Sequence, residues 1–126
     1  MSASYTVLCH PRCSTCKKAL AWLDEHNIEY TWRSIIEENP TTDELSQWTA
    51  ESNLSIRRFF NTYRSAHVKD QLDDWEKNLS AEQVRAQAVE LLATDGMLCK
   101  RPLLIDAQSH FVAVGFKESE WQAALL

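Results

Sequence analysis

The sequence predicts one α/β domain in which helices flank a mixed four-stranded sheet. Near the N-terminus, an apolar run at 5–9 and an alternating run at 28–32 enclose an amphipathic helix pattern, which indicates a βαβ unit. Near the C-terminus, apolar runs at 103–105 and 111–114 are separated by five residues that are compatible with a hairpin loop. Between these halves, residues 41–95 are mainly helical in pattern, so we expect a helical insertion there.

Composition narrows the class of protein. The chain has 126 residues, of which 44% are hydrophobic, and is long enough for one domain with its own core. The formal net charge of -5, with no basic stripe, argues against direct binding to nucleic acid. No apolar run approaches the ~18 residues that a membrane helix needs, and the N-terminus lacks the pattern of a signal peptide. We therefore expect a cytoplasmic protein without membrane contact.

The first half begins with a buried strand at 5–9, which Pro11 separates from a helix running from about Thr15 to His26. The apolar stripe of this helix follows the i, i+3, i+4, i+7 spacing and consists of Cys16, Ala19, Leu20 and Leu23. Cys16 is thus expected to face the core, whereas Cys13 lies at the exposed N-terminal rim. Ile28, Tyr30 and Trp32 alternate with polar residues, which predicts a half-buried strand parallel to the first.

The insertion is predicted from caps and helical spacing. Thr41 to Glu44 resembles a capping box for a helix that turns Leu45 and Trp48 inward. A short helix should follow with Leu54, Ile56, Phe59 and Phe60. Residues 61–79 are ambiguous, although Val68, Leu72 and Trp75 are spaced as one helical face. Ser80 can cap the next helix, whose inward stripe is Val84, Ala88, Leu91 and Leu92, with Gly96 as its stop signal.

After the hairpin strands, a last helix is expected near 118–125. The complete order is then βαβ, helices, ββα. A thioredoxin-like sheet has this order when a helical insertion separates its two halves, so a thioredoxin-like fold is the predicted architecture.

The most informative motif is the C-x-x-C formed by Cys13 and Cys16. Cysteines in a cytoplasmic protein indicate redox catalysis, metal binding or burial rather than a disulfide framework. Sulfurs at i and i+3 on a first helical turn lie within disulfide reach, and unpaired helix N-terminal amides favour a thiolate. Zinc would require four ligands at compatible spacing, and only scattered Cys9, His10 and Cys99 accompany this pair, so we expect no metal. Cys9 and Cys99 are interpreted as small buried apolar residues.

Several stretches together resemble the arsenate reductase and Spx family across nearly the whole chain. The most specific are the Cys13 to Cys16 motif and the Arg101-Pro102 step before a strand. The others lie at 22–26, 28–30, 38–40, 56–62, 95–98 and 114–118. A lone C-x-x-C is a weak signal, but its combination with the Arg-Pro step in this order is characteristic of the family.

The resemblance implies roles for individual residues. Cys13 takes the position of the family's nucleophile, and Arg101 that of an arginine that pairs with the thiolate or with an oxyanion. Pro102 takes the position of a proline that is cis in thioredoxin-like folds. The amides of Ser14, Thr15 and Lys17 would complete the anion-binding loop, and Cys16 would resolve the Cys13 adduct to a reversible disulfide.

Two functional hypotheses remain open from the sequence. One is a thiol-dependent oxidoreductase without a tightly bound cofactor, acting on a small oxyanion or a disulfide, with glutathione or glutaredoxin as electron donor. The other is an Spx-type redox-sensing regulator that binds the C-terminal domain of the RNA polymerase α subunit. Glutathione-dependent arsenate reductases usually carry serine at the position of Cys16. They also carry two further arginines for the oxyanion, of which one corresponds to Asn61 and the other falls within residues 115–117 of this chain. Cys16 therefore resembles Spx and its relatives.

Overall fold

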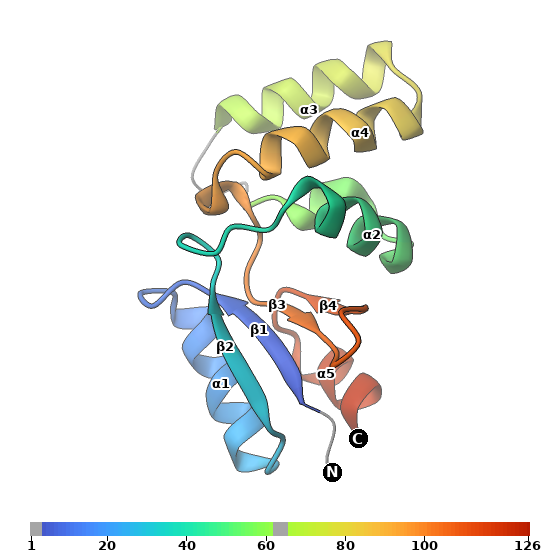
Figure 1. Ribbon diagram of the computed structural model, residues 1–126. Coiled ribbons are helices and arrows are strands. Elements are labelled where there is room, and N and C mark those ends of the chain that lie inside the picture. The colour runs from blue at the N-terminus through green and yellow to red at the C-terminus, as the bar shows by residue number, and fades with distance from the viewer. Residues whose placement is uncertain (1–3, 62–65) are drawn as a thin grey trace.

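The computed structural model describes residues 4–61 and 66–126 and contains one four-stranded sheet in the order β2-β1-β3-β4 (Figure 1). The strands are β1 (Tyr5–Cys9), β2 (Tyr30–Ser34), β3 (Leu103–Ile105) and β4 (Phe111–Val114). β1 is parallel to β2 and antiparallel to β3, and β3 is antiparallel to β4. The predicted mixed sheet, with a βαβ half and a hairpin half, is confirmed.

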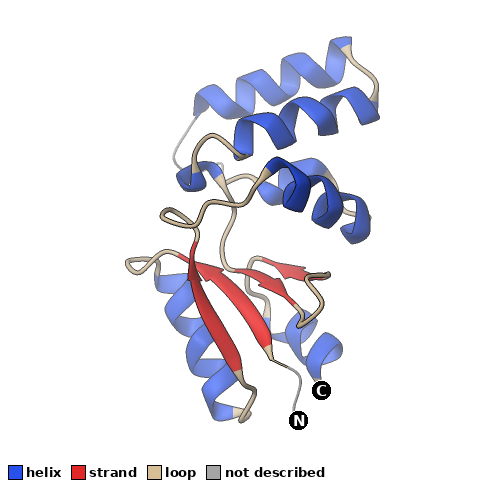
Figure 2. Cartoon of the chain, viewed as in Figure 1, coloured by secondary structure: helices blue, strands red, loops and turns tan. Residues whose placement is uncertain are grey.

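Helices α1 (Ser14–Glu25) and α5 (Glu118–Leu125) cover one face of the sheet, and the inserted helices cover the other (Figures 1 and 2). Alternate residues of β1 show this division, because successive side chains of a strand point to opposite faces. Val7 and Cys9 pack with α1 and with Trp121 of α5, whereas Leu8 packs with the insertion. The cysteine at the end of β1 therefore faces the helix that carries the C-x-x-C motif.

The insertion lies between β2 and β3. Its elements are α2 (Thr42–Ser52), the 3-10 helix η1 (Ile56–Phe59), α3 (Ala66–Asn78), α4 (Ala81–Leu92) and the 3-10 helix η3 (Gly96–Leu98). Thr41 with Glu44 and Ser80 with Gln83 form complete capping boxes at the starts of α2 and α4. The ambiguous segment contains α3, with Val68 and Leu72 buried as their spacing indicated, and its residues 62–65 lie outside the described part.

Two details differ from the sequence-based expectations. The second strand begins at Tyr30 rather than at Ile28, and Trp32, expected to be half-buried on it, keeps 44% of its surface exposed. Within the described residues, β2 is an edge strand that pairs with β1 alone, so fewer side chains are available to cover the indole.

The position of Gly96 had predicted that this glycine stops the preceding helix, and this prediction is wrong. α4 ends at Leu92, and Gly96 instead opens η3 against the backbone that follows β2. A Cβ atom at this position would lie only 1.9 Å from the Ile35 carbonyl oxygen and 2.8 Å from Asn39 Oδ1. The absence of a side chain is thus required by a close backbone approach.

Gly96→Ala should therefore destabilise the fold by about 3 kcal/mol or more, because a backbone atom cannot move aside as a flexible side chain can. Urea unfolding measures this effect. Gly115→Ala is the comparison, because its Cβ would meet the flexible side chain of Lys100, with Cε at 3.3 Å, and its cost is mainly that of a residue at φ +72°, about 1–2 kcal/mol. An equal or smaller loss for Gly96→Ala would contradict the steric argument.

Candidate functional site: a cysteine loop facing a buried arginine

Cys13 occupies the N-cap position of α1, whose first residue, Ser14, lies one residue before the helix start that the sequence predicted. Its amide donates to the His10 carbonyl at 3.1 Å, and its carbonyl accepts the first helical hydrogen bond, from the Lys17 amide, at 3.1 Å. The amides of Ser14, Thr15 and Cys16 precede this bond and are the helix donors available to an anion. The Lys17 amide, expected to join them, is already committed to the helix.

The two cysteines of the motif differ in burial as their helical spacing predicted. Cys16 is 1% exposed and packs among α1 and sheet residues, whereas Cys13 is half-buried at the rim of the same cluster. All four cysteines are free thiols, so the structure represents the reduced protein.

A cavity of about 500 Å³ opens beside Cys13. It is lined by the cysteine loop on one side and by Met97 and Arg101 on the other, and its members are His10, Pro11, Arg12, Cys13, Ser14, Met97 and Arg101. The cavity thus brings together Cys13, Ser14 and Arg101 from the predicted site. Thr15 lines a neighbouring cavity instead.

Arg101 is held rigidly rather than solvated, with only 8% of its surface exposed. Its Nη1 donates to the Met97 and Cys99 carbonyls, each at 3.3 Å. With the Asn61 amide oxygen turned toward the guanidinium, that oxygen accepts from Nη1 at 3.2 Å and from Nη2 at 3.3 Å. The peptide bond from Arg101 to Pro102 is cis, the configuration that the resemblance implied.

The Nε atom of Arg101 is buried and has no hydrogen-bond partner within the described residues. Buried polar groups are nearly always paired, and a buried cation favours an anionic partner. Arg101 and Cys13 line the same cavity. An oxyanion or a thiolate in that cavity would therefore supply the negatively charged partner of the guanidinium.

Three thiols meet at the start of α1. The neighbouring Cys9 thiol lowers the pKa of Cys16, although burial opposes the shift. The His10 amide, the Cys13 thiol and the charge of Arg101 act in the same direction. For Cys9, the interaction with Cys16 and burial both raise the pKa of the thiol. Burial also raises the pKa of Cys99 to about 12, in the separate core of the insertion.

Sequence reasoning missed Met97, interpreted Cys9 only as a small buried apolar residue, and named Asn61 only as a residue at an arginine position of arsenate reductases. A signal for Cys9 was available, since the period of two along β1 places it on the same face as Val7, toward α1. No local pattern marks Met97 or Asn61, because both reach the site through the path of the insertion.

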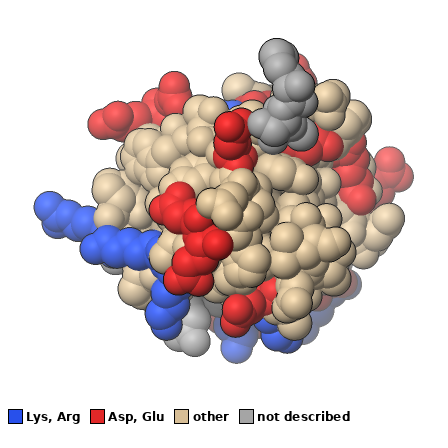
Figure 3. Space-filling model, turned by 90° about the horizontal axis from the view of Figure 1, so that it is seen from below, with Lys and Arg blue, Asp and Glu red and all other residues tan. Residues whose placement is uncertain are grey.

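A second cavity, of about 420 Å³, adjoins the first turn of α1. Its lining includes Thr15, Gly115 and three cationic side chains, those of Arg58, Lys100 and Lys117. Its one acidic member, Glu120, lies 3.7 Å from Arg58. Seen from below, the face near the chain termini instead carries acidic side chains, with basic ones at its edges (Figure 3). The thiol end of the protein is therefore locally cationic despite the net negative charge.

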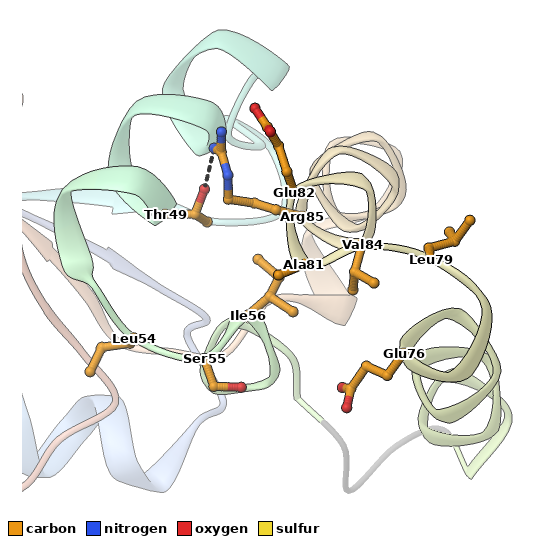
Figure 4. A pocket seen from close by; sticks show the side chains of 10 residues that line it. All are labelled: Thr49, Leu54, Ser55, Ile56, Glu76, Leu79, Ala81, Glu82, Val84 and Arg85. Atoms are coloured by element: carbon orange, nitrogen blue, oxygen red, sulfur yellow. Dashed lines mark hydrogen bonds between the residues drawn. The ribbon is translucent and has the colours of Figure 1, made fainter.

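Another cavity, of about 660 Å³, lies away from the thiols, among α2, η1, α3 and α4 (Figure 4). It contains no cysteine, and its Arg85 is bound to the Ser46 carbonyl and the Thr49 hydroxyl. Within the described residues, no three potential ligands are arranged to hold a metal ion, and no helix is long and apolar enough to cross a membrane.

A cysteine pair at the first turn of α1, opposite a cis-proline loop on a β2-β1-β3-β4 sheet, defines a protein of the thioredoxin-like fold. The family model described as the ArsC family matches residues 8–124, and the chain belongs to this family.

Relatives and solved structures agree with this assignment. The chain is 38% identical over 123 residues to the uncharacterised protein YusI of Bacillus subtilis, covering 94% of this chain and 96% of that protein. It is 29% identical over 116 residues to the global transcriptional regulator Spx of Staphylococcus haemolyticus, covering 91% and 82%. Among solved structures, an ArsC family related protein from Bacteroides fragilis is 41% identical, with a TM-score of 0.79 and coverage of 96% and 98%.

Proposed function

We propose that this protein is a thiol-disulfide oxidoreductase in which Cys13 is the nucleophile and Cys16 the resolving thiol. The observation that supports this most directly is the shared cavity, in which the accessible thiol of Cys13 and the buried, incompletely paired guanidinium of Arg101 meet. A thiolate held beside a fixed cation and helix N-terminal amides is the arrangement that thiol catalysis requires.

The proposed reaction transfers two electrons from the protein to a disulfide. The Cys13 thiolate attacks one substrate sulfur, so that a mixed disulfide forms and the other substrate sulfur leaves as a thiolate. Cys16 then attacks the Cys13 sulfur, which forms the Cys13 to Cys16 disulfide and releases the second substrate thiolate. Two equivalents of an external thiol restore the reduced protein. With an oxyanion as substrate, Arg101 and the Ser14 amide would bind its oxygens.

Glutathione is the proposed electron donor. Its two carboxylates match the cationic cavity lined by Arg58, Lys100 and Lys117, which adjoins the cysteine loop through Thr15. This cavity supports glutathione as a co-substrate rather than as a tightly bound group, because its cationic side chains are at the surface, where salt weakens the attraction.

The test couples the protein to glutathione, glutaredoxin, glutathione reductase and NADPH, with hydroxyethyl disulfide and arsenate as separate substrates. Consumption of NADPH above the rate without the protein is expected for the disulfide. If neither substrate is turned over, and peptide mapping after diamide treatment finds no Cys13 to Cys16 disulfide, the proposal is wrong.

Cys16→Ser should trap the intermediate. Without the resolving thiol, the mixed disulfide between Cys13 and glutathione should persist, visible in the intact mass as one bound glutathione after reaction with oxidised glutathione. The same treatment of the unaltered protein should give mainly the intramolecular disulfide. Equal accumulation of the adduct in both proteins would show that Cys16 does not resolve it.

An Spx-type regulator is the second candidate, and the observation in its favour is the match to Spx over 91% of this chain. In this function, the disulfide would change affinity for the RNA polymerase α subunit rather than turn over a substrate. Binding of the purified C-terminal domain of that subunit, measured for the reduced and the diamide-oxidised protein, tests it. Redox-dependent binding without catalytic NADPH consumption would favour the regulator over the enzyme.

A further inference from the structure

Among the described residues, Arg101 is the arginine with the least exposed surface, and its hydrogen-bond partners there are all neutral. Arg33, Arg57 and Arg58 are more exposed, and each of them is paired with a carboxylate. Arg101 is 8% exposed, and its guanidinium donates to backbone carbonyls and to the side-chain oxygen of Asn61. The described part of the protein therefore fixes this positive charge in place without neutralising it.

Asn61 is held beside Arg101 by its backbone. The Asn61 amide donates to the Leu98 carbonyl at 2.8 Å, and the Lys100 amide donates to the Phe59 carbonyl at 2.8 Å. These two hydrogen bonds flank an antiparallel bridge between residues 60 and 99. The bridge joins the end of η1 to the segment that leads into the cis-proline, so the fold itself sets the position of the Asn61 side chain.

The contact between Asn61 and the guanidinium leaves one edge of that group unused. The Asn61 amide faces Nη1 and Nη2 of Arg101, which can only donate, so its oxygen is the atom turned toward them. This oxygen occupies the end of the planar fork that an arginine otherwise offers to an oxyanion. The Nε atom, on another edge of the plane, is the donor that has no partner within the described residues.

We propose that Asn61 is a positioning residue that keeps the cavity beside Cys13 selective for anions. Its neutral oxygen orients the Arg101 guanidinium without cancelling the charge, so an anionic group that enters the cavity meets a fixed cation next to the thiol. A carboxylate at position 61 would make the same contacts but would pair with the arginine and remove this attraction. The inference rests on the proposed function, because it takes Cys13 as the reacting thiol. It adds the substrate class, which is compounds that carry a negative charge beside the atom that Cys13 attacks.

Two alkylating reagents that differ in charge test this proposal. Iodoacetate is an anion and iodoacetamide is neutral, and both react with the same Cys13 thiolate. The ratio of their rate constants at Cys13, followed by peptide mapping, therefore reports the preference for anions and not the amount of thiolate. Asn61→Asp should lower this ratio about tenfold, because a negative charge at close range offsets that of the arginine. Its urea midpoint should equal or exceed that of the unaltered protein, because both contacts to the guanidinium remain.

Asn78→Asp is the matched control. It adds the same charge to the chain at an exposed position, at the end of α3, which lies far from the start of α1 (Figure 1). The ratio of the two rate constants should not change in this variant. An Asn61→Asp ratio equal to that of the unaltered protein would overturn the role of Asn61.

Asn61→Ala separates positioning from support of the loop. Without the oxygen, the guanidinium keeps its charge but loses its orientation, so the ratio should fall by about threefold. In the Arg101→Met background, the same substitution should cause no further fall, because Asn61 acts through the arginine. A lower urea midpoint of Asn61→Ala with an unchanged ratio for the folded protein would show that Asn61 only supports the loop.

The ratio of alkylation rates does not depend on disulfide exchange. If the expected ratios are found but no disulfide forms between Cys13 and Cys16, the proposed exchange fails and the role of Asn61 stands. If neither reagent labels Cys13, the proposed nucleophile fails, and sulfate is then the probe. Sulfate should shift the NMR signal of the Arg101 Nε–H group in the unaltered protein at concentrations about tenfold below those needed for Asn61→Asp. An equal response of the two proteins to sulfate would overturn the role of Asn61.

Discussion

Cys13→Ser is expected to abolish disulfide exchange, lowering turnover of hydroxyethyl disulfide on the order of 10³-fold or more. A serine hydroxyl is not ionised near neutral pH and cannot form the mixed disulfide through which the electrons pass. Cys13 is also the thiol of the pair that borders the cavity, whereas Cys16 is 1% exposed and has no direct access to a bulky substrate. The measurement is the NADPH-coupled rate, with labelling by iodoacetamide to count the accessible thiols.

Cys99→Ser is the control for Cys13→Ser, because it removes a thiol that is not the proposed nucleophile. Cys99 is buried beside the insertion, where burial raises its pKa to about 12, and its sulfur lies 3.8 Å from the Leu92 carbonyl oxygen. This variant should retain the rate of the unaltered protein after correction for the folded fraction. Undiminished activity of Cys13→Ser would reject Cys13 as the nucleophile, whatever the control shows.

The parts of the fold that the sequence predicted are those set by local periodicity. The stripe of α1, the capping box at Thr41 and the short strands all follow from residue spacing, and the structure contains them. The errors concern tertiary contacts. The close approach of the Ile35 carbonyl to Gly96 and the edge position that exposes Trp32 depend on which segments become neighbours.

The same division applies to the site. Cys13 and Cys16 are close in sequence, so their unequal burial could be predicted from helix geometry alone. The pairing of Asn61 with Arg101 joins two segments on either side of the insertion's α3 and α4. Neither residue has a local pattern that points to the other, and the sequence could assign Arg101 a role only through resemblance.

Arg101→Met is expected to lower kcat/KM by about 10²-fold, which is the usual cost of removing one fixed donor to a developing negative charge. The guanidinium borders the cavity beside Cys13, and its charge also favours the Cys16 thiolate. Both the attack on the substrate and the resolving step should therefore slow. Arg101→Lys should not restore the rate, because an ammonium cannot reproduce the planar fork that contacts the Met97 and Cys99 carbonyls.

The stability of the Arg101 variants must be measured in parallel, because methionine leaves those two carbonyls and the Asn61 amide oxygen without their donor. Arg85→Met is the matched control: it removes a half-buried arginine that also binds a carbonyl, in the remote cavity of the insertion (Figure 4). A lower urea midpoint with unchanged kcat/KM of the folded fraction is expected for Arg85→Met. A lower urea midpoint with unchanged kcat/KM for Arg101→Met would show that Arg101 stabilises the loop and takes no part in the chemistry of Cys13. A role at the reacting sulfur requires kcat/KM of the folded fraction to fall.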